Sequence, residues 1–143
     1  MRTDDSLLTV DDANQRLPLV RAIVRDAIDL KRDVLQRQSR LLDLRERYPD
    51  EGDDGSPYAE EVLQMEESLE ADEIRIDGYS QELRQIGATL QDAETGLVEF
   101  ASSLDGDPVW LSWVYDEPDV SFWRSERDEP ANRRPLEPAE QTN

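Results

Sequence analysis

The chain has 143 residues, which suits one domain, and its 35 acidic and 16 basic residues give a formal net charge of −19. Because the sequence contains neither cysteine nor histidine, it excludes disulfides, zinc fingers and catalysis by Ser-His or Cys-His pairs. No apolar run approaches the ~20 residues that span a bilayer, and the N-terminus lacks the apolar region of a secretion signal, so we expect a cytoplasmic protein without a membrane segment.

The acidic excess favours a protein from a salt-adapted organism, in which dense surface carboxylates hold water and concentrated salt screens their repulsion. The basic residues are almost all arginine, with Lys31 as the single lysine. The competing interpretation is an acidic protein that docks on a basic partner. Under either interpretation a run of carboxylates is most simply solvated surface, so we predict no catalytic residue, no metal site and no cofactor. Nucleic acid is an unfavourable partner, because its phosphates repel such a charge.

The first helical signal begins at Thr9, which can cap a helix together with Asp12 three residues later. Pro18 interrupts a regular helix, so we predict a short helix over 10–16 and a long helix over 18–47 that carries Pro18 in its first turn. Within the long helix the apolar pairs repeat every seven residues, at 27/28, 34/35 and 41/42. This spacing is typical of a coiled coil.

A loop is predicted over 48–56, where one proline, two glycines and four acids oppose a helix. A second long helix over 57–86 then follows, with Ser56 as its cap. Gly87 stands where a left-handed residue ends a helix. The apolar seam of this second helix alternates steps of four and three residues: Tyr58, Val62, Met65, Leu69, Asp72, Ile76, Tyr79, Leu83 and Ile86.

The two helical segments have opposite charge, which favours their association. Residues 1–48 carry ten bases and nine acids, whereas residues 49–107 carry two bases and eighteen acids. Their similar lengths and the short loop predict a long antiparallel helical hairpin, coiled-coil-like, with flanks that attract each other. Asp72, the polar residue of the seam, either specifies the register or faces solvent, and the sequence does not decide between the two.

After Gly87 the pattern changes to a β meander over 88–124. A strand is predicted over 96–101, a turn at 104–108, a strand with clear alternation over 109–115, and a returning strand over 120–124. We therefore predict an α+β fold, with the hairpin packed on a small three-stranded antiparallel sheet, as a single domain over 1–136. The tail at 137–143 is predicted to be disordered.

Several motifs, in this order, resemble the prokaryotic domain of unknown function family 2203. They are Thr9 to Asn14 with Leu17 to Val20, Gly96 to Phe100, Val109 to Trp113, Glu117, Phe122-Trp123, and Arg133-Arg134-Pro135. The resemblance covers about residues 9–136 and implies no assigned biochemistry. Members often carry a cysteine where this chain has Ser112 and a histidine where it has Arg124, so any chemistry of those side chains is expected to be missing here.

One set of residues around the predicted sheet is the candidate ligand site: Glu99, Trp113, Glu117, Trp123, Arg124, Arg133 and Arg134. Arginines bind phosphate or carboxylate groups in bidentate fashion, and tryptophans can line a pocket. An arginine after the last strand could also fold back and grip an acid of the sheet. The alternative roles are structural: the tryptophans form the core, and the charged residues make ion pairs in turns and on the surface.

We expect a non-enzymatic interaction or scaffold domain that forms a homodimer through the helical hairpin, with a further protein partner left open. The alternative is a small-molecule domain that binds or transforms an anionic ligand with the arginines and carboxylates around the tryptophan-bearing sheet. No residue combination meets the requirements of a particular reaction class.

Overall fold

The computed structural model describes residues 7–47 and 57–137, which belong to two compact units. The sheet unit contains the described residues up to Ile28 and those from Tyr79 onward, and the helical unit contains the described residues of Asp29–Gly78. The predicted loop at 48–56 lies outside the described residues, as does the predicted disordered tail beyond residue 137.

Helix α1 spans Val10–Arg47 and begins with the predicted capping pair. The Asp12 amide donates to Thr9 Oγ1 at 3.0 Å, and the Thr9 amide donates back to Asp12 Oδ2 at 3.0 Å. The hydrogen bond from the Thr9 amide holds the pKa of Asp12 below its ordinary value, because it favours the ionised carboxylate. The cap predicted from the sequence is therefore confirmed.

The predicted break at Pro18 is wrong, because α1 continues through this residue as one helix. Proline lacks the N–H that would bond the carbonyl of Asn14, at a cost of about 3 kcal/mol. The turns before it are nevertheless fixed from outside. Val10 and Leu17 are buried in the core, and the Asn14 side chain accepts a hydrogen bond from the Val120 amide at 2.7 Å. Packing against the sheet therefore outweighs the local preference to end the helix.

Helix α2 spans Pro57–Gln85 and ends as the sequence predicts. Gly87 follows with φ of 85°, and its amide donates to the Arg84 carbonyl at 3.1 Å. A side chain at this position would meet Leu8 and Arg16, so glycine is favoured by space as well as by conformation.

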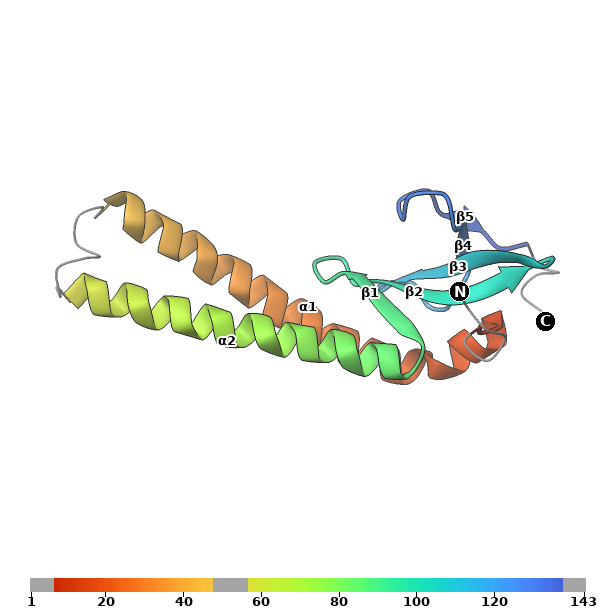
Figure 1. The fold of residues 1–143 in the computed structure, drawn as a ribbon, viewed down its shortest axis with the longest axis horizontal. Helices are drawn as coiled ribbons and strands as arrows, with labels where there is room; N and C mark the ends of the chain where they lie inside the picture. The colour runs from red at the N-terminus through yellow and green to blue at the C-terminus, as the bar shows by residue number, and fades with distance from the viewer. Residues whose placement is uncertain (1–6, 48–56, 138–143) are drawn as a thin grey trace. The chain divides into compact units, whose positions relative to one another are not determined.

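Five strands form one antiparallel sheet in the order β1-β2-β3-β4-β5, each paired with its neighbour in the chain (Figure 1). The strands are β1 (Ala88–Asp92), β2 (Leu97–Leu104), β3 (Asp107–Val114), β4 (Phe122–Ser125) and β5 (Arg134–Pro135). Asp105 and Gly106, with φ of 52° and 84°, join β2 to β3, and two such residues are typical of a type I′ hairpin turn.

The predicted number of three strands is corrected to five, although the α+β class is confirmed. The two added strands are β1 and β5. Strand β5 has two exposed residues, one of them proline, so it carries no alternation that could reveal it. It pairs Arg134 with Trp123 and Pro135 with Phe122 at the sheet edge, where proline is tolerated.

The main core lies between α1 and one face of the sheet. Phe100 on β2 and Trp113 on β3 are completely buried there, together with Val20 and Val24 of α1. Side chains alternate along a strand, so Glu99 and Ser112, the neighbours of Phe100 and Trp113, point to the other face. The sheet therefore has one apolar face and one face that carries buried polar groups.

In the helical unit a small set of apolar side chains of α1 and α2 is buried: Leu30, Val34, Leu41, Leu69 and Ile76. Charged pairs flank it. Arg37 pairs with Asp72, and Arg45, later in α1, pairs at 2.9 Å with Glu66, earlier in α2. Asp72 also contacts Arg75 at 3.3 Å, and only 16% of its side chain is exposed. Of the two roles left open for Asp72, the structure favours a seam residue held by ion pairs.

Candidate functional site

The polar face of the sheet contains a buried ion pair between Glu99 of β2 and Arg124 of β4. Arg124 Nε donates to Glu99 Oε2, and Arg124 Nη2 donates to Glu99 Oε1 at 2.8 Å. Gln91 of β1 donates to the same Oε1 atom at 2.9 Å. Glu99 is 0% exposed and Arg124 is 7% exposed. The geometry is bidentate, the arrangement that best offsets the cost of burying two charges.

The remaining Arg124 donors are also used inside the molecule. Arg124 Nη1 donates to the carbonyl of Asp128, in the segment that follows β4, and its guanidinium lies 5.7 Å from the ring centre of Trp110. Hydrogen bonds to Glu99 raise the pKa of Arg124 above its ordinary value. This arginine therefore ties three strands and the segment after β4 together.

A second pair joins Arg133, just before β5, to Glu117, in the segment between β3 and β4. Besides Glu117, Arg133 bonds Ser112, with Nε donating to Oγ at 2.7 Å. The guanidinium lies 4.2 Å from the ring centre of Phe122, and Glu117 Oε1 also accepts the Val114 amide at 2.8 Å. Arg133 thus folds back onto the sheet at Ser112 and pairs with the acid of the segment between β3 and β4.

The same segment between β3 and β4 is anchored to the core and to α1. Trp113 Nε1 donates to the Glu117 carbonyl at 2.9 Å, which satisfies the polar atom of a fully buried ring. Arg21 of α1 donates to the Pro118 carbonyl at 3.1 Å and lies 5.6 Å from the Trp113 ring centre. No local sequence pattern predicts this role of Arg21, because the contact joins residues 97 positions apart.

A third arginine, Arg134 of β5, lies beside a pocket. Its guanidinium is 5.4 Å from the ring centre of Trp123, and its Nη2 atom is 3.6 Å from Asp128 Oδ2. The pocket has a volume of about 600 Å³ and is lined in part by Pro108, Val109, Trp123, Ser125, Asp128 and Arg134. This volume lies within the range of small-molecule sites.

The structure therefore divides the predicted site residues among separate places. Glu99 joins Arg124, Glu117 joins Arg133, Trp123 joins Arg134, and Trp113 lies in the core. In the first two pairs the arginine donors are already used within the chain, because each arginine bonds an acid and further acceptors. Their chemical role is to hold the sheet, whereas Trp123 and Arg134 line a pocket.

Two classes of site are not found among the residues that the structure describes. No group of three or more acidic side chains there is placed to hold a metal ion. Neither α1 nor α2 has a stretch that is apolar enough to cross a membrane, within the same part of the chain.

Comparison with known proteins identifies a family. The model of an uncharacterized conserved protein family, DUF2203, matches residues 6–136. The chain belongs to this family. Comparisons with curated proteins and with solved structures give no match.

The residues that carry the DUF2203 resemblance all lie in the sheet unit. Of the two departures noted in the sequence, Ser112 accepts a hydrogen bond from Arg133, and Arg124 forms the buried pair with Glu99. Both side chains are engaged in holding the sheet, so this member uses them structurally.

Proposed function

We propose that the chain is a non-enzymatic interaction domain whose partner is a second copy of itself. In this proposal α1 and α2 form an antiparallel, coiled-coil-like hairpin, and the helical unit supplies the dimer contact. The observation that carries it is a pair of exposed leucines on α1: Leu35 is 37% exposed and Leu42 is 59% exposed. Exposed leucines in register on one helix mark a surface that gains free energy when it is covered.

The two leucines continue a stripe that is buried elsewhere on the same helix. Ile28, Leu35 and Leu42 follow each other at intervals of seven residues, which keeps them on one side of α1. Ile28 is buried in the core of the sheet unit, with 6% exposure. In the helical unit the same side of α1 has no such cover among the described residues, and a partner would provide it.

Charge favours a second copy as the occupant. Residues 29–47 of α1 carry six bases and four acids, whereas residues 57–78 of α2 carry one base and eight acids. The acidic helix also exposes apolar side chains, Leu63 at 56% and Ile74 at 64%. A dimer in which each α1 lies against the partner's α2 buries leucines and pairs opposite charges twice, as two-fold symmetry requires.

The alternative function, binding of an anionic ligand, has less support at the two buried ion pairs. Glu99 is 0% exposed, and the Arg124 and Arg133 donors already bond acids and carbonyl or hydroxyl groups of the chain. An incoming anion would have to displace these bonds and leave a buried carboxylate unpaired, which is strongly unfavourable. These residues therefore support a stable scaffold better than a catalytic or binding role.

Light scattering coupled to size-exclusion chromatography in molar salt tests the proposal. We expect the full chain at twice its 16.5 kDa mass. Replacing Leu35 and Leu42 together with glutamate should give the monomer, because two charges in a buried contact are unfavourable. Leu19→Glu is the matched control, since Leu19 is an exposed leucine of α1 in the sheet unit, and it should leave the dimer intact. A monodisperse monomer for the unmodified chain would overturn the proposal.

A further inference from the structure

The pocket beside Trp123 differs from the rest of the sheet in how its charges are paired. Three arginines of this region face acids: Arg124 faces Glu99, Arg133 faces Glu117, and Arg134 faces Asp128. The first two pairs are in close hydrogen-bond contact. In the third, Arg134 Nη2 and Asp128 Oδ2 are 3.6 Å apart, beyond a charge-assisted hydrogen bond. The loose pair is the one that borders the pocket.

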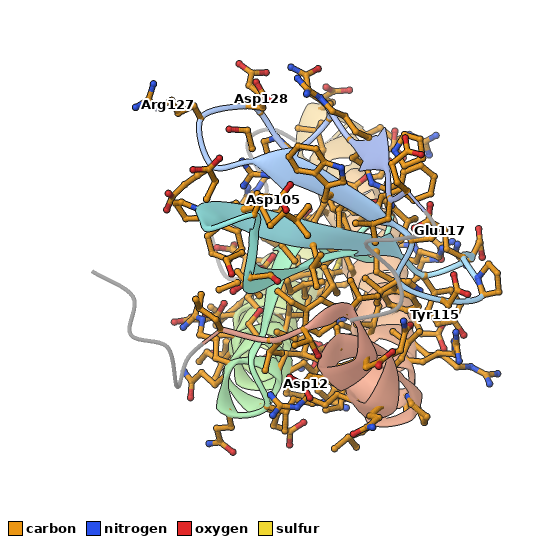
Figure 2. All side chains as sticks on the ribbon, turned by 90° about the vertical axis from the view of Figure 1, so that its right-hand side faces the viewer. Asp12, Asp105, Tyr115, Glu117, Arg127 and Asp128 are labelled. Atoms are coloured by element: carbon orange, nitrogen blue, oxygen red, sulfur yellow. The ribbon has the colours of Figure 1, made fainter. Side chains whose placement is uncertain are left out.

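The acid of this loose pair has an unused acceptor. Asp128 Oδ2 is buried, and it accepts no hydrogen bond within the described part of the chain. A buried carboxylate oxygen without a donor is unfavourable by about 1–3 kcal/mol or more, so such groups usually have a protein, solvent or ligand partner. Figure 2 shows Asp128 beside Arg127 on the loop after β4, with the Arg127 side chain directed away from the sheet. Arg127, the basic residue next to Asp128 in the sequence, is therefore not the partner of the Asp128 Oδ2 atom.

The arginine of the pair is accessible. The Arg134 side chain is 62% exposed, and its guanidinium lies 5.4 Å from the ring centre of Trp123. Arginine binds a carboxylate through two parallel N–H donors. Pro108, Val109 and the indole of Trp123 add an apolar wall to the same pocket.

We propose that this pocket binds a small zwitterion, an α-amino acid with an apolar side chain. The ligand's ammonium group donates to Asp128 Oδ2, and its carboxylate accepts from Arg134. Its side chain lies against Pro108 and Trp123. An α-amino acid carries its donor and its acceptor on one carbon atom, so it can bind both members of the loose pair, which neither a simple anion nor a simple cation would do. The inference concerns the sheet unit alone and does not depend on self-association of the helical unit.

Nitrogen–proton correlation NMR on the full ¹⁵N-labelled chain in molar salt tests the pocket, with L-leucine as the probe. The chain has three tryptophans, so three indole signals are expected, and a Trp123→Phe spectrum assigns that of Trp123. We expect L-leucine to shift the Trp123 signal with a Kd of about 1 mM, an ordinary value for a ligand of this size. The Trp113 indole is an internal control, because it bonds the Glu117 carbonyl in the core and should not move.

Two analogues separate the two charges of the ligand. 4-Methylpentanoate lacks the ammonium group and L-leucinamide lacks the carboxylate, and each should bind at least about tenfold more weakly than L-leucine, since each loses one charge-assisted hydrogen bond. Equal shifts with all three compounds would overturn the zwitterion, and the absence of a Trp123 shift with L-leucine would overturn the site.

Variants of the chain give an independent check. Arg134→Gln and Asp128→Asn should each weaken L-leucine binding by about tenfold. Arg25→Gln, which replaces an exposed arginine of α1, should bind as the unmodified chain does. An unchanged Trp113 signal shows in each case that the sheet unit is folded. Unchanged affinity in folded Arg134→Gln and Asp128→Asn would contradict the proposal.

Discussion

The sheet unit and the helical unit use their charges in different ways. In the sheet unit an acid and an arginine are buried together, at 0% and 7% exposure. In the helical unit the pair Arg45 and Glu66 is about half exposed, at 53% and 47% of the side chains. Buried charges are fixed by geometry and respond little to salt, whereas exposed charges are screened. The comparison predicts that the buried pair of the sheet unit is less sensitive to salt than the exposed pair Arg45 and Glu66 of the helical unit.

The largest expected effect comes from breaking the buried pair. Glu99→Leu should lower the free energy of unfolding by about 3–5 kcal/mol, because it leaves the Arg124 guanidinium buried without its acid. Urea unfolding followed by near-ultraviolet circular dichroism, which reports the tryptophan environment, measures this value.

The double variant Glu99→Leu with Arg124→Leu is the control for that experiment, because it removes both charges. It should recover most of the lost stability if pairing, and not side-chain volume, is the cause. A double variant less stable than Glu99→Leu alone would show that the two residues act independently.

A smaller and more local effect is expected on lowering the salt concentration. The carboxylates of α2 then repel one another without screening, so the helical unit should open before the sheet unit. Hydrogen exchange measured in molar and in low salt should show amides of residues 57–78 exchanging about tenfold faster or more in low salt, with β3 amides little changed. Uniform acceleration, or none, would contradict both this difference and the salt-adaptation interpretation.

The smallest effect is expected at Asp72. A hydrogen bond from Arg37 holds the pKa of this carboxyl below its ordinary value of 3.8. A carboxyl with a lowered pKa contributes stability that is present above its unfolded pKa and is lost as the pH falls through the folded value. The difference in stability between the unmodified chain and Asp72→Asn should therefore shrink as the pH falls below 3.8.

Chemical denaturation at several pH values measures that difference, with Glu67→Gln, an exposed acid of the same helix, as the control. A gap between the unmodified chain and Asp72→Asn that stays constant on acidification would show that the carboxylate charge plays no part.

Much of the fold could be predicted because its signals are local. The Thr9 and Asp12 cap, the end of α2 at Gly87 and the turn before β3 each depend on a few neighbouring residues, and each is present in the structure. The seven-residue spacing likewise indicated two long helices. The errors came where distant contacts decide: Pro18 remains inside α1, and β5 exists because β4 offers it an edge.

The candidate site was predicted in part for the same reason. Residue type alone predicted Glu99, Glu117, Arg124 and Arg133 as site residues. It did not predict which acid pairs with which arginine, or that Glu99 is fully buried. The partners of Ser112 and Arg21 could not be predicted, because these contacts arise from strand register and from packing of distant parts of the chain. Sequence spacing does not specify such pairings.

The sequence by itself determined the two long helices, the three central strands, the charge difference between its two helical segments and the membership of DUF2203. Only the tertiary structure decided which charges are buried in closed pairs and which leave a carboxylate oxygen without a donor. The physical reason is that capping, periodicity and charge runs are properties of neighbouring residues. Burial and pairing, in contrast, depend on strands and helices brought together from distant parts of the chain.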